Sequence, residues 1–144
     1  MSRALDDLSS AMKPRVFEVL ARLTERGVVV AVVSTGRSIE EHQKNLAAGT
    51  SWTALSKHLP RALRIPNLST ADQDYQKSDA IDLCPYETWL SNGPNKLSWD
   101  AGHPAWKILG EIGESVGLRW GGRWAKTPDW GHLELPTPLI GGPA

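Results

Sequence analysis

Apolar residues recur at helical spacing in two stretches of the chain. Residues 13–26 and residues 103–116 each carry one apolar stripe, and Gly27 and Gly117 are placed to end the two helices. Asp100 is positioned to cap the second helix. The stripes consist of Val16, Val19, Leu20 and Leu23 in the first helix, and of Ala105, Ile108, Leu109, Ile112 and Val116 in the second. Each stripe predicts a helix that buries one face.

Four other stretches have the pattern of β-strands. Residues 28–34, VVVAVVS, form a β-branched run that predicts a buried central strand. Polar and apolar positions alternate in residues 79–83, DAIDL, so Asp82 is expected on the face opposite its two apolar neighbours. Residues 118–120 and residues 132–135 predict two more strands, with a glycine pair in the turn that follows the first of them.

The remaining segments complete a single expected domain over residues 1–144. Ser38 and Glu41 form a capping box that begins a short helix. Residues 48–80 keep no period and predict a long loop, and the Pro- and Gly-rich residues 136–144 predict a loosely held tail. We therefore expect an α+β fold with a small, mainly antiparallel sheet flanked by helices.

Composition narrows the range of partners. Sixteen basic and sixteen acidic residues cancel, which argues against nucleic acid as a partner. The longest apolar run, residues 28–33, is too short to insert across a membrane. Cys84 is the single cysteine, so we expect a small buried side chain with no internal disulfide, and metal ligands must be histidines and carboxylates. We expect a monomer.

The stretch that organises these elements is residues 117–135, GLRWGGRWAKTPDWGHLEL. Asp129 lies three residues before His132, and Pro128 suggests that Asp129 lies on a loop that leads into the strand of His132. In that arrangement both side chains point into one cleft, as a metal hydrolase needs an imidazole ligand and a nearby carboxylate base. The alternative is a surface pair or a capping arrangement without chemistry.

Three blocks of the sequence resemble the M15 zinc peptidases, which act on bacterial cell-wall peptides. Residues 34–43, STGRSIEEHQ, are similar to the family's strand, arginine turn and glutamine-bearing helix. The SKH of residues 56–58, followed by the DAIDL of residues 79–83, is similar to the family's paired His and Asp motif. The third block is residues 117–135, which resemble the closing segment of the short phage-type members.

The resemblance implies a role for several residues. His58, Asp82 and His132 correspond to the ligands of a zinc ion, which leave a fourth position open in a cleft at one end of the sheet. Asp129 corresponds to the general base, and Arg37 to the residue that holds and polarises the carbonyl of the cleaved bond. Two further residues match family positions near the metal: Ser56, as a substrate-binding or supporting residue, and Glu134, as a supporting residue.

The chain departs from the family pattern after His58. Twenty-three residues, 59–81, separate His58 from Asp82, which indicates an inserted loop. The loop would lie beside the active site and could shape specificity or act as a lid. We favour Asp82 as the carboxylate ligand because the stretch around it reproduces the family's Ala-x-Asp. The other acids that could replace it are Asp72, Asp74 and Asp79.

The resemblance also implies a function. We expect an endolysin of phage or prophage type that hydrolyses the L-Ala–D-Glu bond in the peptidoglycan stem peptide. The alternative within the family is a D-alanyl-D-alanine carboxypeptidase. The alternative from another class is a non-catalytic cell-wall-binding module, in which tryptophans stack on glycan. Because no basic, apolar and cleavage pattern opens the chain, we expect synthesis in the cytoplasm without a signal peptide, and action on the wall after holin-type release or lysis.

Overall fold

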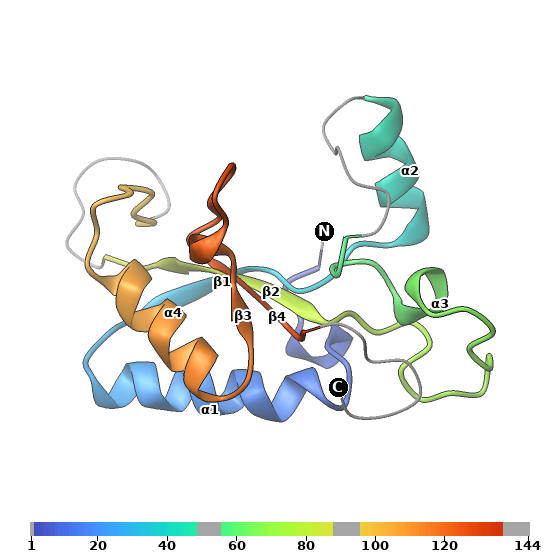
Figure 1. Cartoon of the computed structure of the whole chain (residues 1–144), viewed down its shortest axis with the longest axis horizontal. Coiled ribbons are helices and arrows are strands. Elements are labelled where there is room, and N and C mark those ends of the chain that lie inside the picture. The colour runs from blue at the N-terminus through green and yellow to red at the C-terminus, as the bar shows by residue number, and fades with distance from the viewer. Residues whose placement is uncertain (1, 49–55, 88–95, 137–144) are drawn as a thin grey trace.

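The computed structural model describes residues 2–48, 56–87 and 96–136. This part of the chain contains four α-helices, two short 3₁₀-helices and four strands (Figure 1). The helices are η1 Leu5–Asp7, α1 Met12–Glu25, α2 Ile39–Ala47, α3 Arg61–Arg64, α4 Ala105–Ser115 and η2 Gly121–Arg123. The strands are β1 Val30–Ser34, β2 Ala80–Pro85, β3 Arg119–Trp120 and β4 His132–Glu134.

The four strands form one antiparallel sheet in the order β1-β2-β4-β3. This arrangement confirms the α+β fold expected from the sequence. β2 and β4 occupy the centre, where Ile81 and Leu133 face each other in register. Both side chains are fully buried, so the centre of the sheet contributes directly to the core.

The prediction that residues 28–34 form a central strand is wrong. β1 lies at the edge of the sheet and pairs only with β2 among the described strands. Residues 30–33 are half-buried, and Val30 and Val32 pack against the core. A β-branched run of this kind suits any pleated surface that is covered on one side, so composition did not reveal how many neighbours the strand has.

Helices α1 and α4 cover one face of the sheet (Figure 1). Their apolar residues meet Ile81, Leu83 and Leu133, which point to this face from β2 and β4. The helical contribution comes from Met12, Val16, Val19, Leu23, Leu109 and Ile112. Because side chains alternate along a strand, Asp82 and His132 point to the other face, away from the apolar core.

The helix ends mostly follow the predicted signals. Gly27 and Gly117 both adopt positive φ, of 72° and 89°, directly after α1 and α4. The capping box is present, since Ser38 Oγ accepts from the Glu41 N–H at 3.1 Å and Glu41 Oε1 accepts from the Ser38 N–H at 3.4 Å. Asp100 does not cap α4 and instead accepts from the backbone N–H of Gly102.

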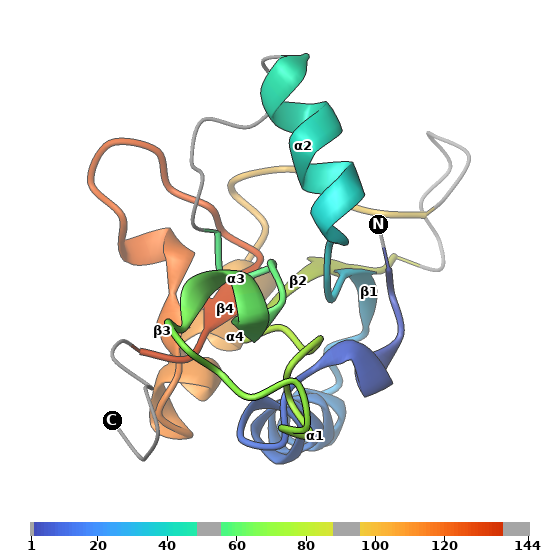
Figure 2. The ribbon, with the colours of Figure 1, turned by 90° about the vertical axis from the view of Figure 1, so that its right-hand side faces the viewer.

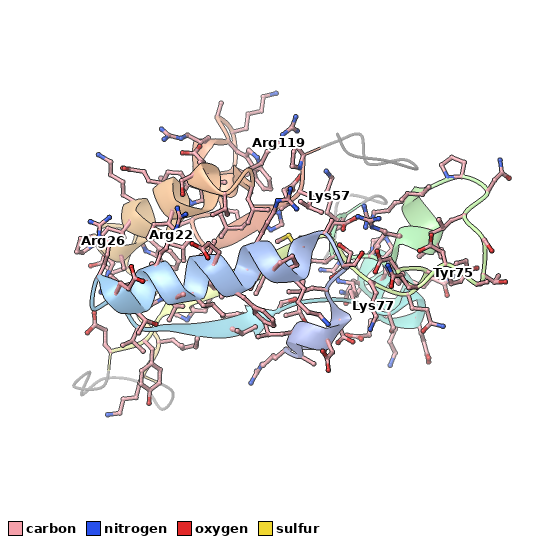
Figure 3. The ribbon with its side chains drawn as sticks, turned by 90° about the horizontal axis from the view of Figure 1, so that it is seen from below. Arg22, Arg26, Lys57, Tyr75, Lys77 and Arg119 are labelled. Carbon is pink, nitrogen blue, oxygen red and sulfur yellow. The ribbon has the colours of Figure 1, made fainter. Side chains whose placement is uncertain are left out.

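The long segment after His58 is ordered where it is described. It contains α3 and returns alongside itself, since the backbone N–H of Arg61 donates to Lys77 and that of Ala62 to Tyr75. This segment lies beyond the N-terminal end of α1, as Lys77 and Tyr75 show in Figure 3. Helix α2 stands away from the sheet in both ribbon views (Figures 1 and 2).

Three features expected from the sequence remain predictions. The first part of the predicted loop, residues 49–55, and nearly all of the predicted tail, residues 137–144, lie outside the described residues. The single-domain organisation is likewise an expectation. Within the described part of the chain, each helix is too short or too polar to cross a membrane.

Candidate active site

The register between β2 and β4 creates the site. Asp82 pairs directly with His132, so their side chains emerge side by side on the face opposite α1 and α4. Nδ1 of His132 lies 3.0 Å from Oδ1 of Asp82. His132 is buried, while the Asp82 side chain is partly exposed, so this pair forms the floor of a site that opens to solvent.

A turn before α3 brings His58 to the same place. Oγ of Ser56 accepts from the His58 N–H, and the His58 carbonyl accepts from the Arg37 N–H. These bonds hold the backbone on both sides of the imidazole. Nε2 of His58 lies 3.1 Å from Oδ2 of Asp82, and the His58 and His132 rings meet edge to face at 5.1 Å. Asp82 therefore lies between the two histidines.

The cluster of His58, Asp82 and His132 could hold a metal ion, because one ligand atom from each lies within 4.8 Å of the others. His58 is 6% exposed; its Nδ1 has no hydrogen-bond partner among the described residues, and its Nε2 contacts only Asp82. Buried polar atoms are rarely left without a partner. Two imidazoles and one carboxylate also form a donor set that zinc accepts. The residues present thus fit a catalytic zinc ion.

The other acids of the insertion are held elsewhere. Asp79 accepts from the guanidinium groups of Arg61 and Arg64, at 2.9 and 2.7 Å. Asp74 accepts from the backbone and hydroxyl of Ser10, and Asp72 caps the turn at Asp74. Among the carboxylates weighed as the third ligand, Asp82 is the one that the fold brings to the two histidines.

The two neighbouring histidines keep Asp82 ionised. Burial alone would raise the pKa of Asp82, but hydrogen bonding to His132 and the charge of His58 outweigh it and hold the pKa well below its usual range. Burial alone would lower the pKa of His132, yet Asp82 and Glu134 raise it to about 9. Asp82 is therefore an anion in the folded protein, ready to bind a cation.

Asp129 lies at the rim of the cluster. Its Oδ2 is 4.0 Å from Nδ1 of His132, and about half of the side chain is exposed. Burial of the rest and repulsion from Asp82 raise the pKa of Asp129, which strengthens the carboxylate as a base. The loop that carries it folds against Gly121, where an added Cβ would lie 2.6 Å from the Asp129 carbonyl. A glycine at this position thus permits the close approach of Asp129.

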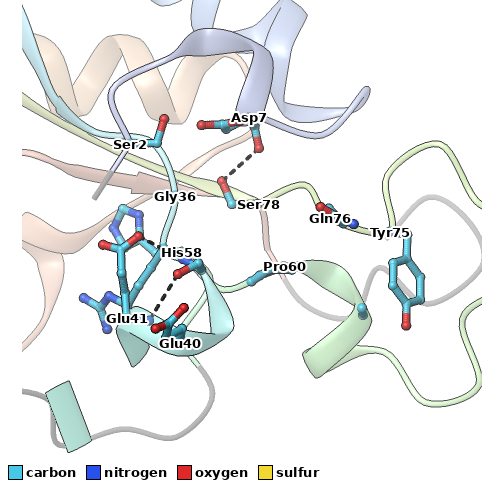
Figure 4. Close-up of a pocket in the computed structure, with 13 residues that line it drawn as sticks. Ser2, Asp7, Gly36, Glu40, Glu41, His58, Pro60, Tyr75, Gln76 and Ser78 are labelled. Atoms are coloured by element: carbon cyan, nitrogen blue, oxygen red, sulfur yellow. Dashed lines mark hydrogen bonds between the residues drawn. The ribbon is translucent and has the colours of Figure 1, made fainter. Parts of the chain in front are cut away.

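Arg37 and His58 line one pocket of about 480 Å³ beside the cluster (Figure 4). Nη1 of Arg37 lies 3.3 Å from Nδ1 of His42, a buried histidine on α2. The structure thus brings Arg37 into a pocket that His58 also lines, with its guanidinium in contact with α2. Ser56 is engaged in the His58 turn, and its predicted contact with substrate stays a prediction.

Comparisons with known proteins bear on this arrangement. A model of the M15 peptidase family, described as D-alanyl-D-alanine carboxypeptidase, matches residues 74–135. Among solved structures, the chain is similar to the L-Ala D-Glu endopeptidase ChiX of Serratia marcescens. The identity is 19% and the TM-score 0.58, and the match covers 92% of this chain and 83% of that chain. The two matches support an M15-family peptidase, and with it a hydrolase of the metallopeptidase class, as expected from the sequence.

The family match covers only part of the candidate site. The matched segment contains Asp82, Asp129 and His132, whereas Arg37 and His58 precede it. Arg37 and His58 are therefore brought to the site by the fold, and the family match does not cover them. The ligand and catalytic roles of these five residues remain predictions.

Sequence reasoning missed a buried ion pair behind His132. Nε2 of His132 lies 2.8 Å from Oε1 of Glu134, and Oε2 of Glu134 lies 3.5 Å from Nζ of Lys57. Lys57 also donates to the Leu135 carbonyl, and its side chain is only 12% exposed. Lysine is rarely buried, so nothing in the sequence other than its place beside His58 pointed to this contact.

Three tryptophans near the site differ in their roles. Trp106 and Trp120 are buried, and their indole N–H groups donate to the carbonyls of Asp100 and Trp130. Trp124 is 39% exposed, and its ring lies 5.0 Å from that of His132. Packing thus explains Trp106 and Trp120, whereas Trp124 covers one side of the cluster of His58, Asp82 and His132.

Proposed function

We propose that this chain is a zinc-dependent peptidase of the M15 type that hydrolyses an amide bond in the peptidoglycan stem peptide. The observation that carries the proposal is the cluster of His58, Asp82 and His132, with Asp129 at its rim. A binding module has no use for an ionised carboxylate between two buried imidazoles beside a second carboxylate of raised pKa. An enzyme is therefore favoured over the non-catalytic cell-wall-binding module.

Each residue has a defined task in this proposal. His58, Asp82 and His132 hold the zinc ion, which supplies Lewis acidity at the cleaved amide when it is bound. Asp129 accepts the proton of the attacking water and later passes it to the leaving amine. Arg37 holds the carbonyl of the cleaved bond through its guanidinium and stabilises the negative charge that develops on the oxygen.

We further propose that the cleaved bond joins L-Ala to D-Glu. The likeness to an L-Ala D-Glu endopeptidase over 92% of the chain supports this choice. The description of the family model, D-alanyl-D-alanine carboxypeptidase, supports the alternative. The proposal includes the expected biological setting, a lysis enzyme of phage type that reaches the wall after release from the cytoplasm.

Digestion of purified peptidoglycan tests the function. The products are labelled at new amino termini and identified by mass spectrometry. Cleavage at L-Ala–D-Glu releases stem peptides that begin with D-Glu, whereas a carboxypeptidase releases free D-Ala. Binding to the wall without new amino termini or free D-Ala would refute the enzymatic proposal. The Asp129→Asn variant is the matched negative control.

A further inference from the structure

The insertion after His58 builds one wall of the pocket beside the metal cluster. Pro60, Ala62, Tyr75 and Gln76 contribute this wall, and the start of α2 lies opposite (Figure 4). The volume of about 480 Å³ falls within the range of about 300–1,000 Å³ that is usual for small-ligand pockets. His58 belongs both to this pocket and to the metal cluster.

This wall is anchored to the rest of the domain. Arg61 and Arg64 bind the carboxylate of Asp79, which is 1% exposed and also accepts from Ser9. Further along, Asp74 accepts from the backbone of Ser10 at 2.9 Å. The insertion is thus attached near the start of α1 at two places. These contacts argue for a preformed wall rather than a lid, because a lid would have to break them in order to open.

Acidic side chains prevail around the pocket. Asp7, Glu40 and Glu41 line it, against Arg37 as the one arginine or lysine among the described lining residues. Glu41 is already engaged, by the capping box and by the amino terminus, while Glu40 is exposed and Asp7 half-buried. His58 also lines this pocket, and its buried Nδ1 makes no hydrogen bond within the described residues. The lining therefore favours a cationic group.

We propose that this pocket binds the terminal amine of the diamino acid that follows D-Glu in the stem peptide. The inference rests on the proposed function. One D-Glu residue separates the cleaved bond from the diamino acid, and two residues span about 7 Å of extended chain. A substrate held at the metal cluster therefore brings this side chain into a pocket that begins at His58. Asp7 and Glu40 supply the carboxylates for the amine, and Tyr75 and Pro60 border its methylene chain.

Two peptides that differ only in the amine provide the test. L-Ala-γ-D-Glu-L-Lys and L-Ala-γ-D-Glu-L-norleucine are hydrolysed by the zinc-loaded protein, and kcat/KM is measured for each. We expect the lysine peptide to be preferred by about tenfold, and the preference to shrink at high salt because charge attraction is screened. A third peptide with meso-diaminopimelate shows, by being faster or slower than the lysine peptide, which diamino acid the pocket fits better.

Matched variants connect the preference to the pocket. In a protein with both Asp7→Asn and Glu40→Gln, the two peptides should be hydrolysed at rates within about twofold of each other. The control is Glu18→Gln, which removes a carboxylate that pairs with Arg22 on α1 and should leave the preference unchanged. Zinc content and melting temperature are recorded for each protein to show that it is folded and loaded.

The outcomes separate this inference from the function on which it rests. Equal hydrolysis of both peptides by the wild-type protein overturns the amine pocket and leaves the peptidase intact. A lysine preference that survives the double substitution also overturns it. If neither the peptides nor purified peptidoglycan is cut at L-Ala–D-Glu by folded, zinc-loaded protein, the proposed function itself fails.

Discussion

Asp82 and His132 face each other across the β2–β4 pair, with Oδ1 of the one 3.0 Å from Nδ1 of the other. The contact joins residues that lie fifty positions apart in the chain. It depends on strand register, because a slip of one residue would turn one of the two side chains into the apolar core. The packing of Ile81 and Leu133 on the opposite face holds that register, and thus the core determines the geometry of the site.

Asp129 and His132 should respond differently to substitution. We expect Asp129→Asn to keep its zinc and its melting temperature and to lose about a hundredfold or more in turnover, because an amide cannot accept the proton of water. We expect His132→Ala to lose metal affinity and stability, since metal binding contributes to folding free energy. Metal analysis, calorimetry and peptide hydrolysis measure these effects. A zinc-free Asp129→Asn beside a zinc-loaded His132→Ala would reverse the two assignments.

Arg37 should matter for the transition state and little for the fold. Arg37→Ala is expected to lose about 2–4 kcal/mol of transition-state stabilisation, as for other donors to a developing oxyanion. The backbone N–H of residue 37 still bonds to the His58 carbonyl in this variant, so the metal cluster should persist. The measurement is kcat/KM on the stem peptide. Arg37→Lys is the control, because it keeps the positive charge but lacks the planar guanidinium group with its paired N–H donors. Near-normal turnover in zinc-loaded Arg37→Ala would remove the arginine from the mechanism.

The ion pair of Lys57 and Glu134 should tune the metal site through His132. Glu134 lies 2.8 Å from Nε2 of His132 and leaves Nδ1 on the side of Asp82. Burial alone would raise the pKa of Glu134, but His132 and Lys57 outweigh it and lower the pKa, so the glutamate stays ionised. We expect Glu134→Gln and Lys57→Met each to weaken zinc binding by about 10–100-fold. Competition with a coloured chelator measures this affinity.

Lys77 provides the control for Lys57. Its ammonium also donates to a backbone carbonyl, that of Asp6, but it belongs to the exposed insertion rather than to the metal cluster. Lys77→Met should therefore leave the zinc affinity unchanged. Equal zinc affinities of the wild-type, Lys57→Met and Glu134→Gln proteins would show that the pair serves packing alone.

Acid should destabilise the protein partly through Asp79. Burial alone would raise the pKa of Asp79, but Arg61, Ser9 and Arg64 outweigh it and lower the pKa in the folded state. This carboxylate therefore stabilises the fold above the unfolded pKa of about 3.9, and the contribution is lost as the pH falls through the lower folded value. Asp79→Asn should cost about 3–5 kcal/mol at neutral pH, because two guanidinium groups lose their partner.

Urea unfolding between pH 7 and about pH 2 checks this prediction. The free energy of unfolding of the wild-type protein should fall more steeply with acid than that of Asp79→Asn, so that the two curves converge at low pH. Parallel curves would mean that Asp79 does not contribute to the acid sensitivity.

The sequence was most informative where periodicity and local signals act together. The stripes of α1 and α4 and the glycines that follow them depend on neighbouring residues, so they were predicted to within one or two positions. Alternation in residues 79–83 placed Asp82 on the correct face. The helical repeat of the apolar stripes and the two-residue alternation of the strands are enough to predict the layers of the fold.

Contacts between distant segments could not be predicted in the same way. The edge position of β1 depends on which strands pair, and a β-branched run carries no information on its partners. α3 spans one turn, too short to show a helical period. His58 reaches the site from a turn, so its place was suggested by resemblance and not by periodicity. The burial of Lys57 follows from the surrounding fold, and no pattern in the sequence predicts it.

Titration of the metal-free protein with zinc tests the central claim most directly. Hydrolysis of the L-Ala–D-Glu bond is measured as zinc is added to apoprotein that has been freed of metal by a chelator. We expect no turnover without zinc, a linear rise in turnover as zinc is added, and a plateau at about one equivalent per chain. In Asp82→Ala at the same concentrations, the rise should be lost or greatly weakened. Full turnover in the metal-free protein, or an unchanged titration of Asp82→Ala, would contradict the account.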